Sequence, residues 1–232
     1  MSDQLHAGAA MIDITPPPGT HLAGSGAGEH RPAQSVMDPL YAKAIAFAAG
    51  GQRVVMVVLD LTIVTGDYSE RIRAEIGART GIASEAVTQT HSAPGLGHFM
   101  LDPDFPLALA AEDEYIRGSQ NAYGDQAAAA AVAAAVEAVD KLQPARMGLG
   151  RGVLGDLAFN RRGIRRDGTI AMPKPQGRER QPFGIDDICY LEGPMDPEVG
   201  VCCIQDLDLK PIAFMLHYTY HPVNAFGNPQ TY

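Results

Sequence analysis

The residues best suited to chemistry lie between Val87 and His98, where a short strand-like run breaks into a loop rich in glycine, proline and polar side chains. A strand holds its last residues rigidly, and the following loop leaves side chains and backbone N–H groups free to face a ligand. His91 is the first candidate, because an imidazole can accept or donate a proton near neutral pH. The local sequence leaves a hydrogen-bonded structural histidine as an equal alternative.

The elements around this loop predict a βαβ unit. Arg53–Leu61 contains a continuous apolar run, which is typical of a central strand covered on both faces. An amphipathic helix is expected over Asp67–Thr80, followed by a strand over Glu85–Thr90. Such a unit would deliver Gln89 and His91 at the carboxyl end of its second strand.

The remaining elements predict an α/β fold, with one or more mixed sheets flanked by helices. Gly50-Gly51 predicts a hairpin turn before the apolar strand. An alanine-rich structural helix is expected from about residue 112 to 142, with a break at Gly118, Asn121 or Gly124 as an alternative. The other expected strands are Ala9–Thr15, Leu40–Ala49, Pro144–Val153, Leu157–Asn160, Ile185–Leu191, Val199–Asp206 and Pro211–Tyr220.

Two charged features lie outside the His91 loop. Asp60 ends the apolar strand, where a carboxylate can cap a helix, support a ligand histidine or face solvent. The segment Arg161–Gly168 has four arginines in six positions and is expected to be a loop. A solvated turn is the favoured interpretation, and binding of a carboxylate or phosphate is the alternative, because a guanidinium group forks onto such anions.

Composition and charge restrict the class of function. The chain is 46% hydrophobic and 19% charged, as expected for a globular protein, and its net charge of −9 argues against a nucleic-acid partner. The longest apolar tract, Ala127–Val136, is too short to be a transmembrane segment, and residues 1–6 do not resemble a secretion signal. The three cysteines favour buried thiols, and hence a cytoplasmic location.

Four stretches, in order, resemble a known family. Val87–Gly95 is similar to the His-Thr-His-Ser-Gly-Pro-Gly signature of the neutral/alkaline non-lysosomal ceramidases, zinc-dependent hydrolases of the sphingolipid amide bond. Ala7–Pro17, and Met37–Ala44 with the strand after it, resemble the first strands of that family. Asn160-Arg161 and Tyr220–Val223 match its Asn-Arg and His-Pro motifs. The resemblance implies that residues 1–232 form a single ceramidase-like α/β catalytic region, the N-terminal part of a catalytic domain.

The resemblance also implies roles for individual residues. His221 matches a zinc ligand, His91 and Arg161 match catalytic residues, and Gln89, Ser92 and Asn160 are assigned to substrate binding. Gln89 replaces the first zinc histidine of the family, and an amide oxygen is a poorer zinc ligand than an imidazole nitrogen. We therefore expect no tightly bound zinc in this chain, with another divalent metal as the alternative. The family's other ligands and its nucleophile follow the His-Pro motif, which predicts a missing C-terminal portion or a companion chain.

Three functions follow from these features. The first is a metal-assisted hydrolase of an amide or related bond in a small-molecule substrate, with His91 and Arg161 stabilising the oxyanion. The second is a metal-independent lyase or isomerase that uses His91 as acid or base beside Gln89. The third is a non-catalytic binding module on the same fold. Self-association into a homo-oligomer is left open.

Overall fold

The computed structural model describes residues 4–20, 33–84, 87–91, 99–100, 120–158, 160, 162–171 and 188–219. The described elements are, in chain order, β1 (His6–Asp13), β2 (Tyr41–Ala49), β3 (Gln52–Leu59), β4 (Ile63–Val64), α1 (Gly66–Thr80), β5 (Val87–His91), β6 (Phe99–Met100), α2 (Asn121–Asp140), β7 (Gln143–Val153), β8 (Gly163–Arg165), β9 (Ile170–Ala171), β10 (Ile188–Leu191), β11 (Glu198–Asp206) and β12 (Pro211–Tyr218). They form two compact units. The first contains residues 1–147 and 203–213, and the second contains residues 148–202 and 214–220.

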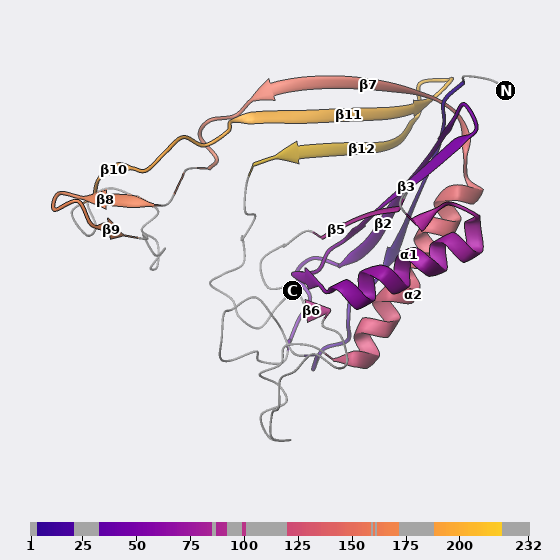
Figure 1. The fold of residues 1–232 in the computed structure, drawn as a ribbon, viewed down its shortest axis with the longest axis horizontal. Helices are drawn as coiled ribbons and strands as arrows, with labels where there is room; N and C mark the ends of the chain where they lie inside the picture. Colours follow the sequence, from indigo (N-terminus) through magenta and orange to yellow (C-terminus); the bar gives the residue numbers. More distant parts are fainter. Residues whose placement is uncertain are drawn as a thin grey trace. The chain divides into compact units, whose positions relative to one another are not determined.

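The main sheet has seven strands in the order β12-β11-β7-β1-β2-β3-β5 (Figure 1). β1 pairs antiparallel with β2 and β7, and β2 pairs antiparallel with β3, whereas β3 and β5 are parallel. The sheet is therefore mixed, and the α/β fold class is confirmed. Because α1 connects the parallel strands β3 and β5, the expected βαβ unit is confirmed as well.

The hairpin between β2 and β3 turns at two glycines, as predicted. Gly50 and Gly51 have φ angles of 55° and 82°, which glycine adopts without steric cost. The turn places Ala49 opposite Gln52 and fixes the register as far as Ala42 opposite Leu59. This register decides which β2 side chains lie beside the end of β3.

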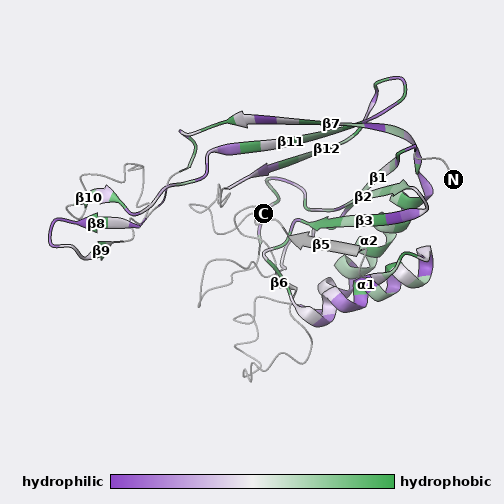
Figure 2. Ribbon diagram, turned by 45° about the horizontal axis from the view of Figure 1, so that its top comes forward, coloured by the Kyte–Doolittle hydropathy of each residue, from purple (hydrophilic) through white to green (hydrophobic). Residues whose placement is uncertain are grey.

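The core of the first unit lies between the sheet and the two helices: α2 covers one face of β1, β2 and β3, and α1 packs against α2 and β5 (Figure 1). Ala42, Ala44 and Ala46 of β2 are at most 2% exposed. The strongly apolar α2 (Figure 2) faces them with small side chains, which lets helix and sheet pack closely. The buried alanines of α2 are Ala127, Ala128, Ala131, Ala134, Ala135 and Ala138. The structural role expected of the alanine tract is confirmed.

Glycine marks the two closest approaches to α2. A Cβ added at Gly8 of β1 would lie 2.2 Å from the carbonyl oxygen of Ala138, at the end of the helix. Gly124 lies within α2 and does not break it, and a Cβ there would lie 2.6 Å from the hydroxyl of Tyr68 on α1. A break at Gly124 is therefore wrong, whereas Gly118 lies outside the described residues. The helix itself begins at Asn121, and its expected start near residue 112 lies outside the described residues.

The face of β3 directed away from the helices differs from the prediction. Val55, Val57 and Leu59 are fully buried against the helices, but Val54 is 42% exposed and Met56 and Val58 are half-buried. β3 is thus covered on the face toward the helices and not on both faces as predicted. The apolar residues on the other side form a half-exposed sheet surface.

The second unit contains a small sheet in the order β10-β8-β9. β8 lies within the segment expected to be a basic loop, whereas the described residues of Leu157–Asn160 form no strand. The pairing of β8 with β10 explains the difference, because Gly163 lets the Ile188 side chain lie against the β8 backbone. The predicted strand lies a few residues before the observed one.

The three cysteines are thiols, but they are not all buried as expected. Cys189 of β10 is exposed, and Cys202 and Cys203 of β11 are half-buried. Among the described residues, no helix combines the length and apolar character needed to span a bilayer.

Candidate active-site edge of the sheet

One edge of the sheet brings together the ends of three strands and the start of a fourth. β1 ends at Asp13 opposite Tyr41, the first residue of β2. β3 ends at Leu59, which pairs with His91, the last residue of β5. Ligands of α/β sheets bind at the carboxyl ends of parallel strands, so this edge of β3 and β5 is the candidate active site.

The structure places some of the predicted site residues at this edge. His91 ends β5, and Gln89 lies two residues earlier in register with Val57. Ser92, Arg161 and His221 lie outside the described residues, so their predicted roles are untested. Asn160 is described in the second unit, where its side-chain oxygen accepts a hydrogen bond from the backbone N–H of Arg162 at 3.0 Å.

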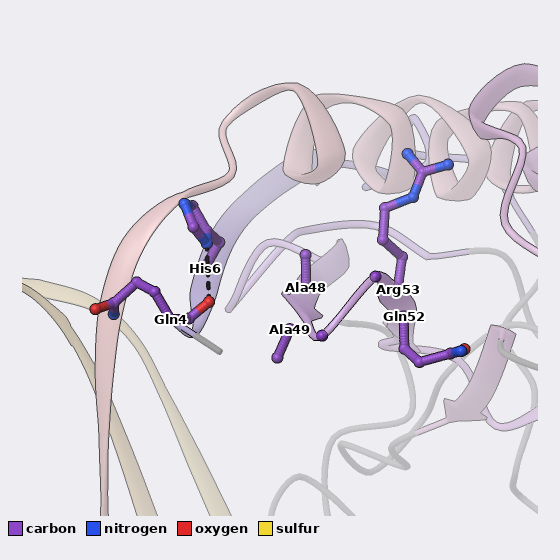
Figure 3. A pocket seen from close by; sticks show the side chains of 8 residues that line it. Gln4, His6, Ala48, Ala49, Gln52 and Arg53 are labelled. Carbon is purple, nitrogen blue, oxygen red and sulfur yellow. Dashed lines mark hydrogen bonds between the residues drawn. The ribbon is translucent and has the colours of Figure 1, made fainter. Parts of the chain in front are cut away.

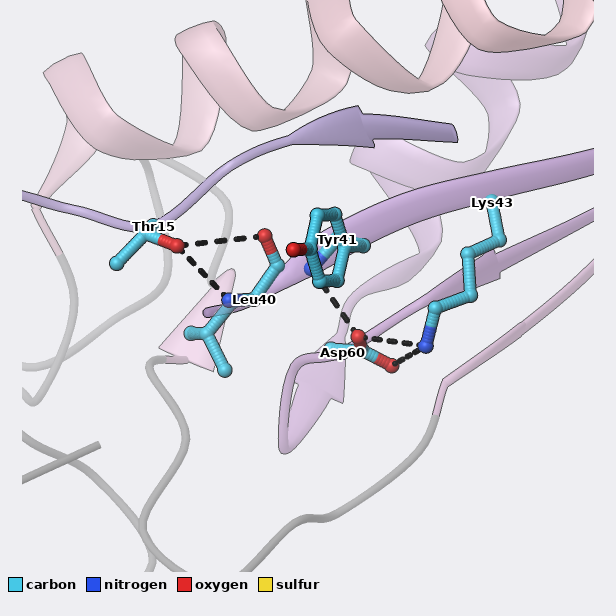
Figure 4. Close-up of polar contacts among 5 residues, drawn as sticks. All are labelled: Thr15, Leu40, Tyr41, Lys43 and Asp60. Atoms are coloured by element: carbon cyan, nitrogen blue, oxygen red, sulfur yellow. Dashed lines mark hydrogen bonds and ion pairs between the residues drawn. The ribbon is translucent and has the colours of Figure 1, made fainter. Parts of the chain in front are cut away.

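Asp60 is a buried carboxylate directly after β3. It is 7% exposed, and both of its oxygens accept hydrogen bonds from Lys43 Nζ, at 3.0 and 2.8 Å (Figure 4). The backbone N–H of Tyr41 donates to the same carboxylate at 3.1 Å, and the Asp60 N–H donates to the Tyr41 carbonyl at 3.0 Å. The end of β3 is therefore tied to the start of β2 by backbone and side chain together.

The end of β1 is fixed by a turn on the same edge. The Asp13 carboxylate accepts a hydrogen bond from the backbone N–H of Thr15 at 2.7 Å, and hydrogen bonding from Thr15 lowers the pKa of Asp13. The Thr15 hydroxyl in turn accepts from the backbone N–H of Leu40 at 2.8 Å (Figure 4). These bonds connect the residues after β1 to those before β2 and keep the edge ordered.

The basic segment of the second unit is partly a hairpin with its own ion pair. Arg162 Nε lies 2.6 Å from a carboxylate oxygen of Glu192, and both side chains are about half exposed. The Asp167 carboxylate accepts from the N–H and hydroxyl of Thr169, which lowers the pKa of Asp167. The described part of this segment thus resembles the favoured solvated turn more than an anion site.

The described residues form a shallow hollow of about 240 Å³ at the opposite end of β2 and β3, beside the Gly50-Gly51 turn (Figure 3). His6 lines it, with its Nδ1 donating to the Gln4 carbonyl at 3.1 Å. The hollow is open and contains none of the predicted site residues. We therefore assign it no catalytic role.

Sequence reasoning noted Asp60 but missed Lys43. The available signal was a lysine inside an otherwise apolar strand, Ala42-Lys43-Ala44-Ile45, where an unpaired charge would be costly. Across the described ranges, no group of three histidine, cysteine or acidic side chains lies close enough to hold a metal ion.

Comparison with solved structures shows that the chain has the mixed α/β fold found in neutral ceramidases. One match is a ceramidase described as complexed with C2, with a TM-score of 0.64 and 19% identity, covering 94% of this chain and 31% of that chain. The neutral ceramidase of Pseudomonas aeruginosa matches with the same TM-score and identity, over 95% of this chain and 32% of its own. The chain thus spans about a third of the length of these proteins. No protein-family model and no curated protein matches it.

Proposed function

We propose that this chain contributes the His91-bearing edge of a ceramidase-like hydrolase that cleaves an amide or related bond of a small molecule. The observation that carries the proposal is the shared fold, which extends over 94% of the chain and has His91 at the carboxyl end of a parallel strand. The proposed catalytic residues are His91 and Arg161, and the proposed substrate-binding residues are Gln89, Ser92 and Asn160.

The proposed chemistry is addition of water to a carbonyl carbon, followed by cleavage of the carbon–nitrogen bond. An imidazole at the end of a strand can take the proton from water and return it to the leaving amine. The guanidinium group of Arg161 would stabilise the negative charge that develops on the carbonyl oxygen. Hydrogen bonding by Gln89 would orient the substrate.

The site residues predicted from the resemblance do not by themselves fit a zinc site. His91 and His221 offer two imidazoles and Gln89 a weak amide oxygen, whereas zinc usually takes three or four strong protein ligands. Metal assistance through His221, with zinc or a harder oxygen-preferring ion, stays a prediction.

Gln89 also favours an alternative function. A metal-independent lyase, isomerase or binding module needs hydrogen-bonding and acid–base groups, which Gln89 and His91 supply, and does not need the histidine that Gln89 replaces. Turnover of an amide substrate distinguishes hydrolysis from these alternatives.

Activity tests the proposal directly. The intact protein is incubated with fluorogenic N-acyl aminocoumarins carrying acyl chains of increasing length, and release of the free amine is followed. We expect turnover, and a loss of at least about 100-fold in His91→Ala, because general acid–base catalysis contributes about that much. His6→Ala is the matched control, since His6 lies in the first unit at the other end of β2. Equal activity of His91→Ala and His6→Ala, or no cleavage of any amide, would refute the proposal.

Metal analysis tests the role of Gln89. After dialysis against a chelator, we expect the natural protein to hold much less than one zinc per chain, and Gln89→His to gain zinc affinity. Stoichiometric zinc in the natural form would show that the donor count is wrong.

We also propose that a further polypeptide, either a C-terminal portion or a companion chain, covers exposed apolar side chains of β7 and β12. Leu149 and Val153 of β7 are 80% and 81% exposed, and Phe214 and Leu216 of β12 are 64% and 72% exposed. Large apolar side chains that gather into one exposed patch usually mark an interface. The isolated chain should bind a hydrophobic dye, and Leu149→Ser with Phe214→Ser should reduce that binding. A stable homo-oligomer of the isolated chain that buries these side chains would show that a second copy is the occupant.

The location of the protein stays a prediction. The odd number of cysteines, which fits thiols better than a disulfide framework, is the sequence feature that favours a reducing compartment and hence the cytoplasm.

A further inference from the structure

The Lys43–Asp60 pair is placed where it can influence the candidate site. Asp60 follows Leu59 directly, and Leu59 is the register partner of His91. Because β3 and β5 are parallel, the same edge carries the end of β3, held by Asp60, and the end of β5, which bears His91.

The pair is more than a surface contact. The Asp60 side chain is 10% exposed and that of Lys43 is 43% exposed, so the carboxylate is desolvated while the ammonium group reaches solvent. A buried carboxylate that lost its cation would keep the cost of desolvation without the compensating attraction. Lys43 Nζ also lies 5.7 Å from the centre of the Tyr41 ring. The cation therefore lies near both a carboxylate and an aromatic ring.

The same contacts fix the end of β3 against β2, and β3 in turn pairs with β5. Lys43 pairs with Val58 in the ladder, and the hydrogen bond from the Asp60 N–H to the Tyr41 carbonyl extends the ladder one step beyond Leu59. Sliding or fraying of the end of β3 would break these contacts. Since β5 is hydrogen-bonded to β3 at Leu59, fraying there would move the backbone of His91.

We propose that Lys43 and Asp60 are a positioning pair for His91: they hold the end of β3 and thereby set the position of the last residue of β5. The pair acts through the backbone and touches no reacting atom. The catalytic consequence rests on the proposed hydrolase function, whereas the positioning does not.

Backbone NMR tests the positioning without any substrate. In ¹H–¹⁵N spectra, Asp60→Asn and Lys43→Met are each compared with Asp125→Asn, which removes the charge from the Arg71 pair between α1 and α2. We expect both edge variants to shift the same amides, those of residues 89–91, by at least three times the shift caused by Asp125→Asn. Lys43→Arg keeps the cation and should restore most of the natural positions. If the amides of residues 89–91 move no more than in Asp125→Asn, the positioning is refuted, even if the protein hydrolyses amides.

Turnover tests the consequence separately. With the N-acyl aminocoumarins, we expect Lys43→Met to lower kcat at least about tenfold and to change KM less than twofold, with recovery in Lys43→Arg. Unchanged kcat despite shifted amides would overturn the catalytic part of the proposal. Absence of turnover in the natural protein would refute the proposed hydrolase function. The NMR result alone would then decide whether Lys43 and Asp60 position His91.

Discussion

Gly8→Ala should destabilise the protein more than its small size suggests, because backbone surrounds the added methyl group. The new Cβ would lie 2.2 Å from the Ala138 carbonyl oxygen, 2.7 Å from the Lys141 carbonyl carbon and 2.9 Å from the Leu142 nitrogen. Ordinary contacts of a Cβ begin near 3.4 Å, so the end of α2 must move by about 1 Å. No side-chain rotation can relieve this overlap.

The expected cost follows from two opposing effects. Overpacking a core typically costs about 1–3 kcal/mol, and overlap with three backbone atoms at the end of α2 places this site near 3. Replacing glycine by alanine lowers the entropy of the unfolded chain, which returns about 0.4–1 kcal/mol. The net loss should be about 2 kcal/mol, or a fall in Tm of about 4–8 °C for a chain of this size.

Urea unfolding measured by circular dichroism at 222 nm reports on α1 and α2, which both belong to the first unit. Gly66→Ala is the control, since a Cβ at Gly66 meets nothing within 4 Å. We expect Gly66→Ala to leave the free energy of unfolding unchanged or slightly raised. Equal free energies of unfolding for the two variants would refute the close approach of α2 to β1.

Three further predictions concern the helices and the second unit. Burial, followed by the charge of Asp125, raises the pKa of Tyr68 in the folded protein. The contribution of the Tyr68 hydroxyl to stability is therefore present below pH 10 and is lost as the pH rises through the folded-state pKa. In that pH range, the difference in unfolding free energy between the natural protein and Tyr68→Phe should shrink. Gly124→Ala should cost about 1 kcal/mol, since overlap with Tyr68 exceeds the gain in helix propensity, and a double-mutant cycle with Tyr68→Phe should show relief. Glu192→Gln should change the unfolding free energy by less than about 0.5 kcal/mol, because its pair with Arg162 is half exposed; a larger loss would indicate an interaction beyond this pair.

Much of the candidate edge follows from the sequence because its signals are local. The two-residue turn at Gly50-Gly51 fixes the hairpin register, and counting outward from it places Tyr41 opposite Asp60. That count also brings Lys43 within reach of Asp60, although the pair was not recognised. The parallel position of β5 follows from the helix between it and β3.

The second unit could not be predicted in the same way because its pairings are long-range. Leu157 begins a run that looks like a strand, yet it is 64% exposed. The strand forms instead at Gly163–Arg165, since Ile188 packs over Gly163 from a strand more than twenty residues later. No periodicity in the sequence encodes a contact of that kind.

The backbone of β5 can be retained while the chemistry of its side chains changes, for a simple physical reason. Histidine and glutamine both fit an extended backbone, so exchange at position 89 leaves the β3–β5 ladder intact while changing an imidazole donor into an amide. Fold similarity at 19% identity therefore shows that the strands pair in the same way, and does not show which side chains bind a metal. The zinc content of the natural protein and of Gln89→His separates the two: if the backbone of β5 is positioned as in the ceramidase structures, one substitution should raise zinc affinity without changing the fold, and unchanged affinity would place the difference in the backbone.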